Sequence, residues 1–169
     1  MVHDPALLDA LERFDSESWE GVVFRHVLGG TAPDRANVRG TRWNPPEVSA
    51  LYVSLDRETA KAEGDRILEV QSVRPRVKRF IYELGLRLDR VLDLSEKADL
   101  AAVGISEDEL GGDSFEACQR VGGAVAWGEH DGLLVPSVRH EGGKNLVVYT
   151  ANQAVESELE VRAKTEIVE

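Results

Sequence analysis

Residues 39–64 constrain the fold more than any other part of the chain, because several rigid and regular elements follow one another there. Pro45 and Pro46 each fix a φ angle, exclude a helix at this point and redirect the backbone. The next residues predict a short strand in which Tyr52 and Ser54 share one face. We therefore expect a turn, a strand and the start of a helix in close succession, with the rest of the chain packed around them.

A helix is predicted over residues 57–70, and it carries an unexpected acid at Glu63. Apolar residues such as Ile67 stand at helical offsets from Glu63, so the pattern places this carboxylate on the face directed to the core. An unpaired buried carboxylate is costly, and Glu63 must therefore be paired or hydrogen-bonded. The nearest polar candidates in the sequence are Arg42 and Tyr52.

Length and charge limit the class of protein. The chain has 169 residues, of which 42% are hydrophobic and 30% charged, as in a soluble globular protein with one core. The formal net charge of −11 argues against a protein that coats nucleic acid, because phosphate contacts need clustered Lys and Arg. A small anionic ligand is compatible with this charge, because a few local arginines are enough to bind it.

The single cysteine, Cys118, excludes an internal disulfide, and no set of Cys and His residues has the spacing of a zinc site. Cys118 lies in an apolar helical pattern, which predicts a buried structural thiol. The N-terminus has no signal-peptide pattern, and no apolar run is long enough to span a bilayer. We expect a cytoplasmic protein without a metal, a membrane anchor or direct contact with nucleic acid.

The periodicity of apolar residues predicts an alternation of helices and strands. Residues 16–21 are expected to form a turn, and Gly122 and Gly123 to loosen the end of a helix. Helices are expected at residues 5–14, 57–70 and 113–126, a polar, helix-inclined segment at residues 95–110, and strands at residues 21–28, 78–86, 132–137 and 145–149.

Three separated motifs stand out along the chain, namely RGTRWNPP, ALYVSLDRETAKAE and LLVPSVRHEGGKNLVVY. Together they resemble the RES domain family, in the family's order and over residues 22–149. RES domains are the toxins of RES–Xre toxin–antitoxin modules, degrade NAD and have a fold related to ADP-ribosyltransferases. The resemblance therefore implies a toxin that uses NAD as a substrate, without a cofactor, and a separate Xre-type antitoxin as its partner.

The same resemblance implies the architecture. We expect a single α/β (α+β) domain over residues 1–169, with a mixed, strongly bent sheet and flanking helices like those of ADP-ribosyltransferases. Its core would occupy about residues 20–150, and the acidic residues 151–169 would form a peripheral strand or a tail. Family members commonly have a glycine after the paired prolines, whereas this chain has Glu47, so the geometry of that loop is a point of difference.

Cleavage of the nicotinamide–ribose bond of NAD explains why the family would need these residue types. An arginine fork matches phosphate oxygens and stays charged when partly buried. A tyrosine can stack on the nicotinamide ring, and a glutamate can hold a ribose hydroxyl, stabilise an oxocarbenium-like transition state or activate the nucleophile. The resemblance implies that Arg42, Tyr52, Glu63 and Ser137 are catalytic, and that Arg25, Arg42, Tyr52, Ser54 and Asn145 bind NAD.

Each of these residues also has a structural interpretation. Tyr52 fits a core position of a strand, Ser137 and Asn145 fit turn positions, and Arg25 fits the outer face of an edge strand. Arg42 has Trp43 or Asp56 as an alternative partner. We assign Trp43 and the turn at residues 44–46 to architecture, and we interpret His26 as structural or solvent-facing.

The sequence leaves the acceptor of ADP-ribose open. Transfer to water or inorganic phosphate would make the protein an NAD glycohydrolase or phosphorylase, and transfer to a protein would make it a mono-ADP-ribosyltransferase. A third alternative is a non-catalytic module on the same fold that binds a nucleotide or a partner. The sequence also leaves open whether the chain forms a homo-oligomer.

Overall fold

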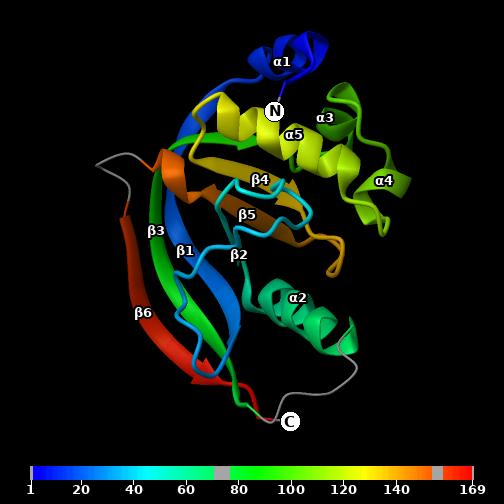
Figure 1. The fold of residues 1–169 in the computed structure, drawn as a ribbon. Helices are drawn as coiled ribbons and strands as arrows, with labels where there is room; N and C mark the ends of the chain where they lie inside the picture. The colour runs from blue at the N-terminus through cyan, green and yellow to red at the C-terminus, as the bar shows by residue number, and fades with distance from the viewer. Residues whose placement is uncertain (1, 71–76, 154–157, 169) are drawn as a thin grey trace.

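A closed sheet forms the centre of the protein (Figure 1). The computed structural model describes residues 2–70, 77–153 and 158–168. Six strands follow the order β1-β2-β5-β4-β3-β6, and an additional pairing of β1 with β3 closes the first five into a barrel. The strands are β1 (Ser16–Leu28), β2 (Ala50–Ser54), β3 (Arg79–Asp93), β4 (Gly132–Pro136), β5 (Lys144–Tyr149) and β6 (Glu158–Glu166).

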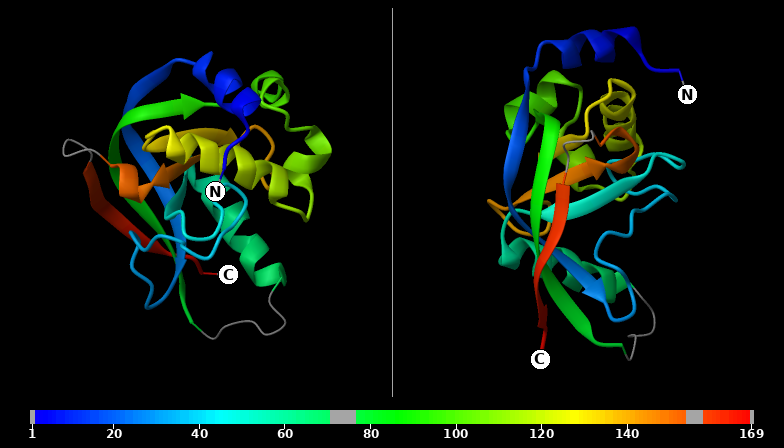
Figure 2. Two further views of the ribbon diagram at one scale, coloured as in Figure 1. Left: turned by 45° about the horizontal axis from the view of Figure 1, so that its top comes forward. Right: turned by 90° about the vertical axis from the view of Figure 1, so that its left-hand side faces the viewer.

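Strands β1 and β3 form a long antiparallel pair that runs beside β6 (Figure 2). Because β3 is long, its other edge has two neighbours: residues 80–87 pair with β6, and residues 91–93 pair in parallel with β4. The predicted turn at residues 16–21 is wrong, since these residues begin β1 and pair with the end of β3. The expected bent, mixed sheet is present, and its closure into a barrel was not predicted.

Alternation along the strands separates two apolar clusters. Leu51 and Leu146 belong to the cluster enclosed by the barrel, together with Val23 and Leu84. The opposite faces of β4 and β5 pack against helix α5 (Glu116–Trp127), whose Val121 belongs to the second cluster. Helix α5 therefore covers one face of the sheet, and helix α2 (Arg57–Val70) lies past the end of β2 (Figure 1).

Two of the short helices have a side-chain cap at their first turn. Asp4 accepts a hydrogen bond from the backbone N–H of Ala6 at the start of α1 (Pro5–Glu12). Ser106 and Glu109 form a capping box on α4 (Glu107–Gly111), which follows α3 (Lys97–Ala102). A 3₁₀ turn, η1 (Thr150–Asn152), follows β5. Across the described ranges, none of the helices has the length and apolarity needed to cross a membrane.

Gly122 allows α5 to lie directly on the turn at residues 43–46. A Cβ atom at Gly122 would collide with the carbonyl group of Trp43, which also accepts a hydrogen bond of 2.9 Å from the Tyr149 hydroxyl. The expectation that Gly122 and Gly123 loosen the helix end is therefore wrong, because the helix continues to Trp127. At Gly122 the absence of a side chain lets α5 pack closely against the turn.

Asn44 organises the turn, as its assignment to architecture predicts. It is completely buried, and its Oδ1 accepts hydrogen bonds from the Thr41 hydroxyl at 2.9 Å and the Tyr52 hydroxyl at 2.6 Å. Its Nδ2 donates to the Val48 carbonyl at 2.7 Å. One side chain thus ties the turn to β2, because every polar atom it buries has a partner.

The backbone conformation of Glu47 gives a physical reason for the glycine that the resemblance implies at this position. Its φ angle is +77°, in the left-handed region where a side chain causes strain and glycine does not. A glycine at this position would avoid the strain, whereas Glu47 adopts the conformation at an energetic cost.

Replacing Glu47 by glycine should raise the free energy of unfolding by about 1 kcal/mol, since the removed strain exceeds the added chain entropy. Urea denaturation measures the effect, which corresponds to an increase in Tm of about 2–4 °C. Gly30→Ala is the matched opposite change, because Gly30 has a φ of +87° and open space around it. It should lower stability, and an unchanged or lower stability of Glu47→Gly would contradict the strain argument.

Candidate active site

A cleft of about 700 Å³ opens beside β2, between α2, the segment after β1 and the connection from α4 to α5. Its volume lies in the range of small-molecule sites. Ser137 is not part of the lining, but its neighbours Pro136 and Val138 are. The other residues predicted for the site all line this cleft: Arg25, Arg42, Tyr52, Ser54, Glu63 and Asn145.

Glu63 is held by two neutral donors. Its Oε1 accepts a hydrogen bond of 2.7 Å from the Ser137 hydroxyl and one of 2.8 Å from Asn145 Nδ2. The predicted need for hydrogen bonding is therefore met, but by Ser137, which follows β4, and by Asn145 of β5 rather than by Arg42 and Tyr52. The reason is tertiary, because α2 directs Glu63 toward the β4–β5 turn.

The face of α2 that carries Glu63 was predicted to face the core, and this is wrong. Ile67 is 43% exposed and lines the cleft together with Glu63 and Arg66. Ala60, one turn earlier, is buried. The apolar stripe therefore leaves the core midway along the helix, because the barrel ends there and the cleft begins.

Two further contacts orient the donors to Glu63. Ser54 lies opposite Asn145 in the β2–β5 register, and its hydroxyl donates to Asn145 Oδ1 at 2.7 Å. The Ser137 hydroxyl accepts the backbone N–H groups of Arg139 at 3.1 Å and His140 at 3.2 Å, so its own proton is directed to Glu63. Ser54, Asn145 and Ser137 thus fix the carboxylate in one orientation.

Tyr52 presents its ring to the cleft while its hydroxyl is used for architecture. The hydroxyl donates to Asn44 Oδ1 and accepts the backbone N–H of Trp43 at 2.9 Å. Burial raises the pKa of Tyr52 to about 12, so the phenol stays protonated and keeps its donor role. The ring face is the part of Tyr52 left for a ligand.

Arg42 connects the turn to the segment between α4 and α5. Its Nη1 donates to the carbonyl groups of Leu110 at 2.6 Å and Gly112 at 3.1 Å, and its guanidinium lies 4.6 Å from the centre of the Phe115 ring. Neither alternative partner named from the sequence, Trp43 or Asp56, takes this place in the described contacts. Arg42 lines the cleft and at the same time holds one of its walls.

Arg25 fastens the segment after β1 to β2. Its Nη1 donates to the Tyr52 carbonyl and its Nη2 to the Arg35 carbonyl, each at 3.0 Å. Burial lowers the pKa of Arg25 to about 10, an effect that Asp34 opposes, so the side chain remains a cation at neutral pH. The interpretation as an outward arginine of an edge strand is wrong, because β1 pairs with both β2 and β3.

Three cleft arginines were not identified from the sequence: Arg35, Arg66 and Arg139. Arg66 stands one helical turn after Glu63, and Arg139 two residues after Ser137, so spacing could have indicated both. Arg35 lies in an irregular segment and gives no such signal. With Arg25 and Arg42, five arginines line the cleft, against the carboxylates of Glu63 and Asp113.

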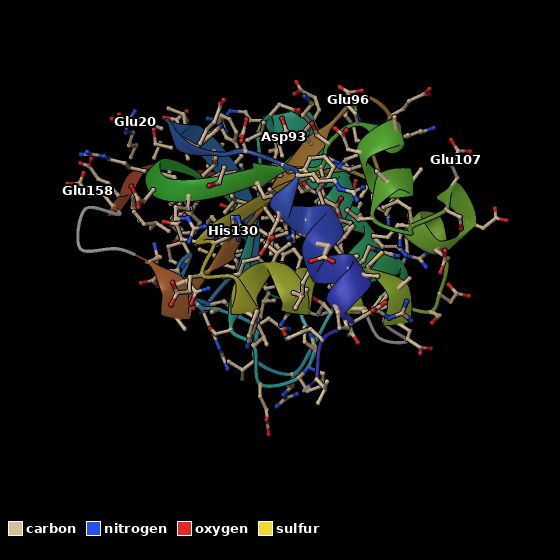
Figure 3. The ribbon with its side chains drawn as sticks, turned by 90° about the horizontal axis from the view of Figure 1, so that it is seen from above. Glu20, Asp93, Glu96, Glu107, His130 and Glu158 are labelled. Carbon is tan, nitrogen blue, oxygen red and sulfur yellow. The ribbon has the colours of Figure 1, made fainter. Side chains whose placement is uncertain are left out.

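The cleft is therefore cationic inside an acidic protein whose formal net charge is −11. Glu20, Glu107 and Glu158 are exposed and point outward at the periphery of the molecule (Figure 3). Local cations of this kind attract a small anion and orient it, while the acidic surface disfavours long polyanions. Among the residues with a described structure, no group of three or more His, Cys, Asp and Glu side chains could hold a metal ion.

Comparison with known proteins identifies the family. The RES domain matches residues 11–167, nearly the whole chain. The chain belongs to the RES domain family. The curated relatives include the NAD(+) phosphorylase MbcT of Mycobacterium bovis and that of Mycobacterium tuberculosis. Each is 29% identical over 162 residues, which cover 89% of this chain and 83% of the relative.

The fold of this RES domain also has a solved counterpart. The crystal structure of the M. tuberculosis MbcT–MbcA toxin–antitoxin complex contains a chain that matches with a TM-score of 0.83. The match has 24% sequence identity and covers 97% of this chain and 93% of the other. This similarity confirms the single α+β domain with a mixed sheet and flanking helices.

Tyr52→Phe should lower the free energy of unfolding by about 1–3 kcal/mol, because it removes one of the two hydroxyl donors to buried Asn44 and leaves the Trp43 N–H without its acceptor. The ring that lines the cleft stays in place. Urea denaturation measures the change, and Tyr82→Phe is the control, since no hydrogen bond of its hydroxyl occurs among the described residues. Equal stability of the two variants would show that the Tyr52 hydroxyl does not hold the turn.

Proposed function

We propose that this RES domain is a toxin that degrades NAD by cleaving its nicotinamide–ribose bond and transfers ADP-ribose to inorganic phosphate. The observation that carries the proposal is the Glu63 carboxylate, held in one orientation by Ser137 and Asn145 inside an arginine-lined cleft. The curated relatives named NAD(+) phosphorylase support the substrate and the acceptor.

The cleft offers complementary groups for each part of NAD. The pyrophosphate and the incoming phosphate are anions, and Arg35, Arg66 and Arg139 supply guanidinium groups at the cleft. The ring of Tyr52 offers a flat surface for the nicotinamide. Arg25 and Arg42 add positive charge, although part of each guanidinium is bonded to backbone carbonyls.

In the reaction, the bond between ribose C1′ and the nicotinamide nitrogen breaks, and its electron pair leaves with neutral nicotinamide. Positive charge develops on the ribose, and the Glu63 carboxylate stabilises it or holds the adjacent hydroxyl. A phosphate oxygen then bonds to C1′, which gives phosphorylated ADP-ribose. In this scheme Ser137, Asn145 and Ser54 position Glu63, because their described hydrogen bonds lead to its Oε1.

The same proposal includes the finer fold relationship and the partner. The bent sheet, with a cleft beside β2, supports a relationship to ADP-ribosyltransferases. The solved relative is a toxin in complex with its antitoxin, which supports a separate antitoxin for this chain. The resemblance to RES domains implies that this antitoxin is of the Xre type, and we propose that it covers the cleft. Loss of NAD would then arrest growth until the antitoxin binds.

Incubation of the purified protein with NAD, with and without phosphate, tests the proposed function. Chromatography and mass spectrometry should show free nicotinamide and phosphorylated ADP-ribose, and the rate should depend on phosphate. Free ADP-ribose would indicate water as the acceptor, and a modified protein in a host lysate would indicate a transferase. Intact NAD under all of these conditions would contradict an enzymatic activity and favour a module that only binds a nucleotide or a partner.

Glu63→Gln should lower kcat about 100-fold, because it removes the negative charge that faces the ribose while it keeps the shape of the side chain. The amide oxygen still accepts from Ser137 and Asn145, so the fold and the KM for NAD should change little. Glu58→Gln on the same helix is the control, since Glu58 is exposed and does not line the cleft. Equal rates for both variants would exclude a catalytic role for the Glu63 charge.

A further inference from the structure

Helix α2 has to hold a fixed rotation on the barrel if Glu63 is to stay in place. Gly64 directly follows Glu63, so its hydrogen takes the position of a side chain about 100° further around the helix. Gly64 is buried, and a Cβ atom there would collide with the imidazole ring of His26 on β1. The His26 ring therefore fills the space beside the helix where a side chain would otherwise stand.

His26 is itself held by a chain of contacts that returns to α2. Arg79 of β3 donates from Nε to His26 Nε2 at 2.9 Å, and from Nη2 to Asp65 Oδ1 at 2.6 Å. Asp65 is the residue after Gly64, so the helix is fixed at two consecutive positions. The Arg79 side chain is only 10% exposed, which shields these contacts from solvent.

The protonation state of His26 follows from its donor. A guanidinium only donates, so Nε2 of His26 accepts and its ring proton lies on Nδ1. Burial and the neighbouring Arg79 cation lower the pKa of His26 to about 4, and the ring is neutral at pH 7. Neutral His26 therefore accepts from Arg79 without repelling it.

We propose that the contact between His26 and Gly64 is a positioning element, which sets the rotation of α2 on β1 and thereby holds the Glu63 carboxylate in the cleft. His26 touches no reacting atom in this scheme. It lines the cleft but acts on the reaction through α2, and its effect on activity rests on the function proposed above for Glu63.

The sensitivity of the reaction to this contact follows from geometry. Glu63 Oε1 meets Ser137 and Asn145 at 2.7 and 2.8 Å, and a small rotation of α2 would break both bonds. A misplacement of about 1 Å at a catalytic group can cost about 100-fold in rate. His26 and Gly64 also line the cleft. A change in their contact that rotates α2 should nevertheless lower kcat more than the KM for NAD, because it displaces the Glu63 carboxylate.

The first test introduces the missing Cβ atom. Gly64→Ala should lower kcat about 100-fold with the KM for NAD changed less than about threefold, as expected for a displaced catalytic group. Gly128→Ala is the control, because Gly128 has an ordinary φ of −76° and its Cβ would meet nothing closer than 3.4 Å. A folded Gly64→Ala protein with the kcat of the control would overturn the proposal.

The second test changes the ring instead of the glycine, and it decides the question if Gly64→Ala does not fold. His26→Ala should lower kcat about tenfold, and His26→Gln, which keeps an acceptor for Arg79, should recover most of that loss. In the double variant His26→Ala/Gly64→Ala, the methyl group added at position 64 fills the space that the His26 ring vacates. The kcat of this double variant should therefore be at least about tenfold higher than that of Gly64→Ala alone. Independent, additive losses would overturn the proposal.

A crystal structure of Gly64→Ala, or of His26→Ala if the former does not fold, separates this inference from the proposed function. Separation of Glu63 Oε1 from Ser137 Oγ and Asn145 Nδ2 supports the positioning role, whatever the enzyme does with NAD. Unchanged distances of 2.7 and 2.8 Å would overturn it. A wild-type protein that leaves NAD intact contradicts the proposed function alone.

Discussion

The position of one carboxylate determines how the cleft is built. Glu63 is half-buried, and a carboxylate taken out of water needs hydrogen bonds to replace those it loses. Asn145 of β5 and Ser137, directly after β4, provide them, and Ser54 fixes the amide of Asn145 in turn. These donors are neutral, and no salt bridge to Glu63 occurs among the residues that the structure describes. The negative charge therefore stays available to a cation that develops in the cleft.

The arginines around this carboxylate divide into two groups with different tasks. Arg25 and Arg42 donate to backbone carbonyls and hold segments that have no regular structure of their own. Arg35 and Arg139 are exposed along the same cleft, and Arg66 lines it from α2. An acidic protein thereby acquires a local site for anions, and the walls of that site are fixed by the same residue type that attracts the ligand.

The elements around the cleft are packed closely enough that glycines and one strained residue set their distances. Gly122 admits the Trp43 carbonyl next to α5, and Gly64 admits the His26 ring next to α2. Glu47 adopts a left-handed backbone conformation that the turn requires. These positions bear on function through geometry, because none of them contributes a reacting group.

The sequence alone determined the helix at residues 57–70, the architectural turn and a set of polar residues that the structure brings to one cleft. These depend on local backbone preferences and on motifs, which a single chain displays directly. The tertiary structure decided the hydrogen-bond partners of Glu63, the carbonyl groups to which Arg42 donates and the extension of β1 into residues 16–21. Each arises from contacts between segments far apart in the chain, and local periodicity carries no information about which distant backbone group will lie within hydrogen-bond distance.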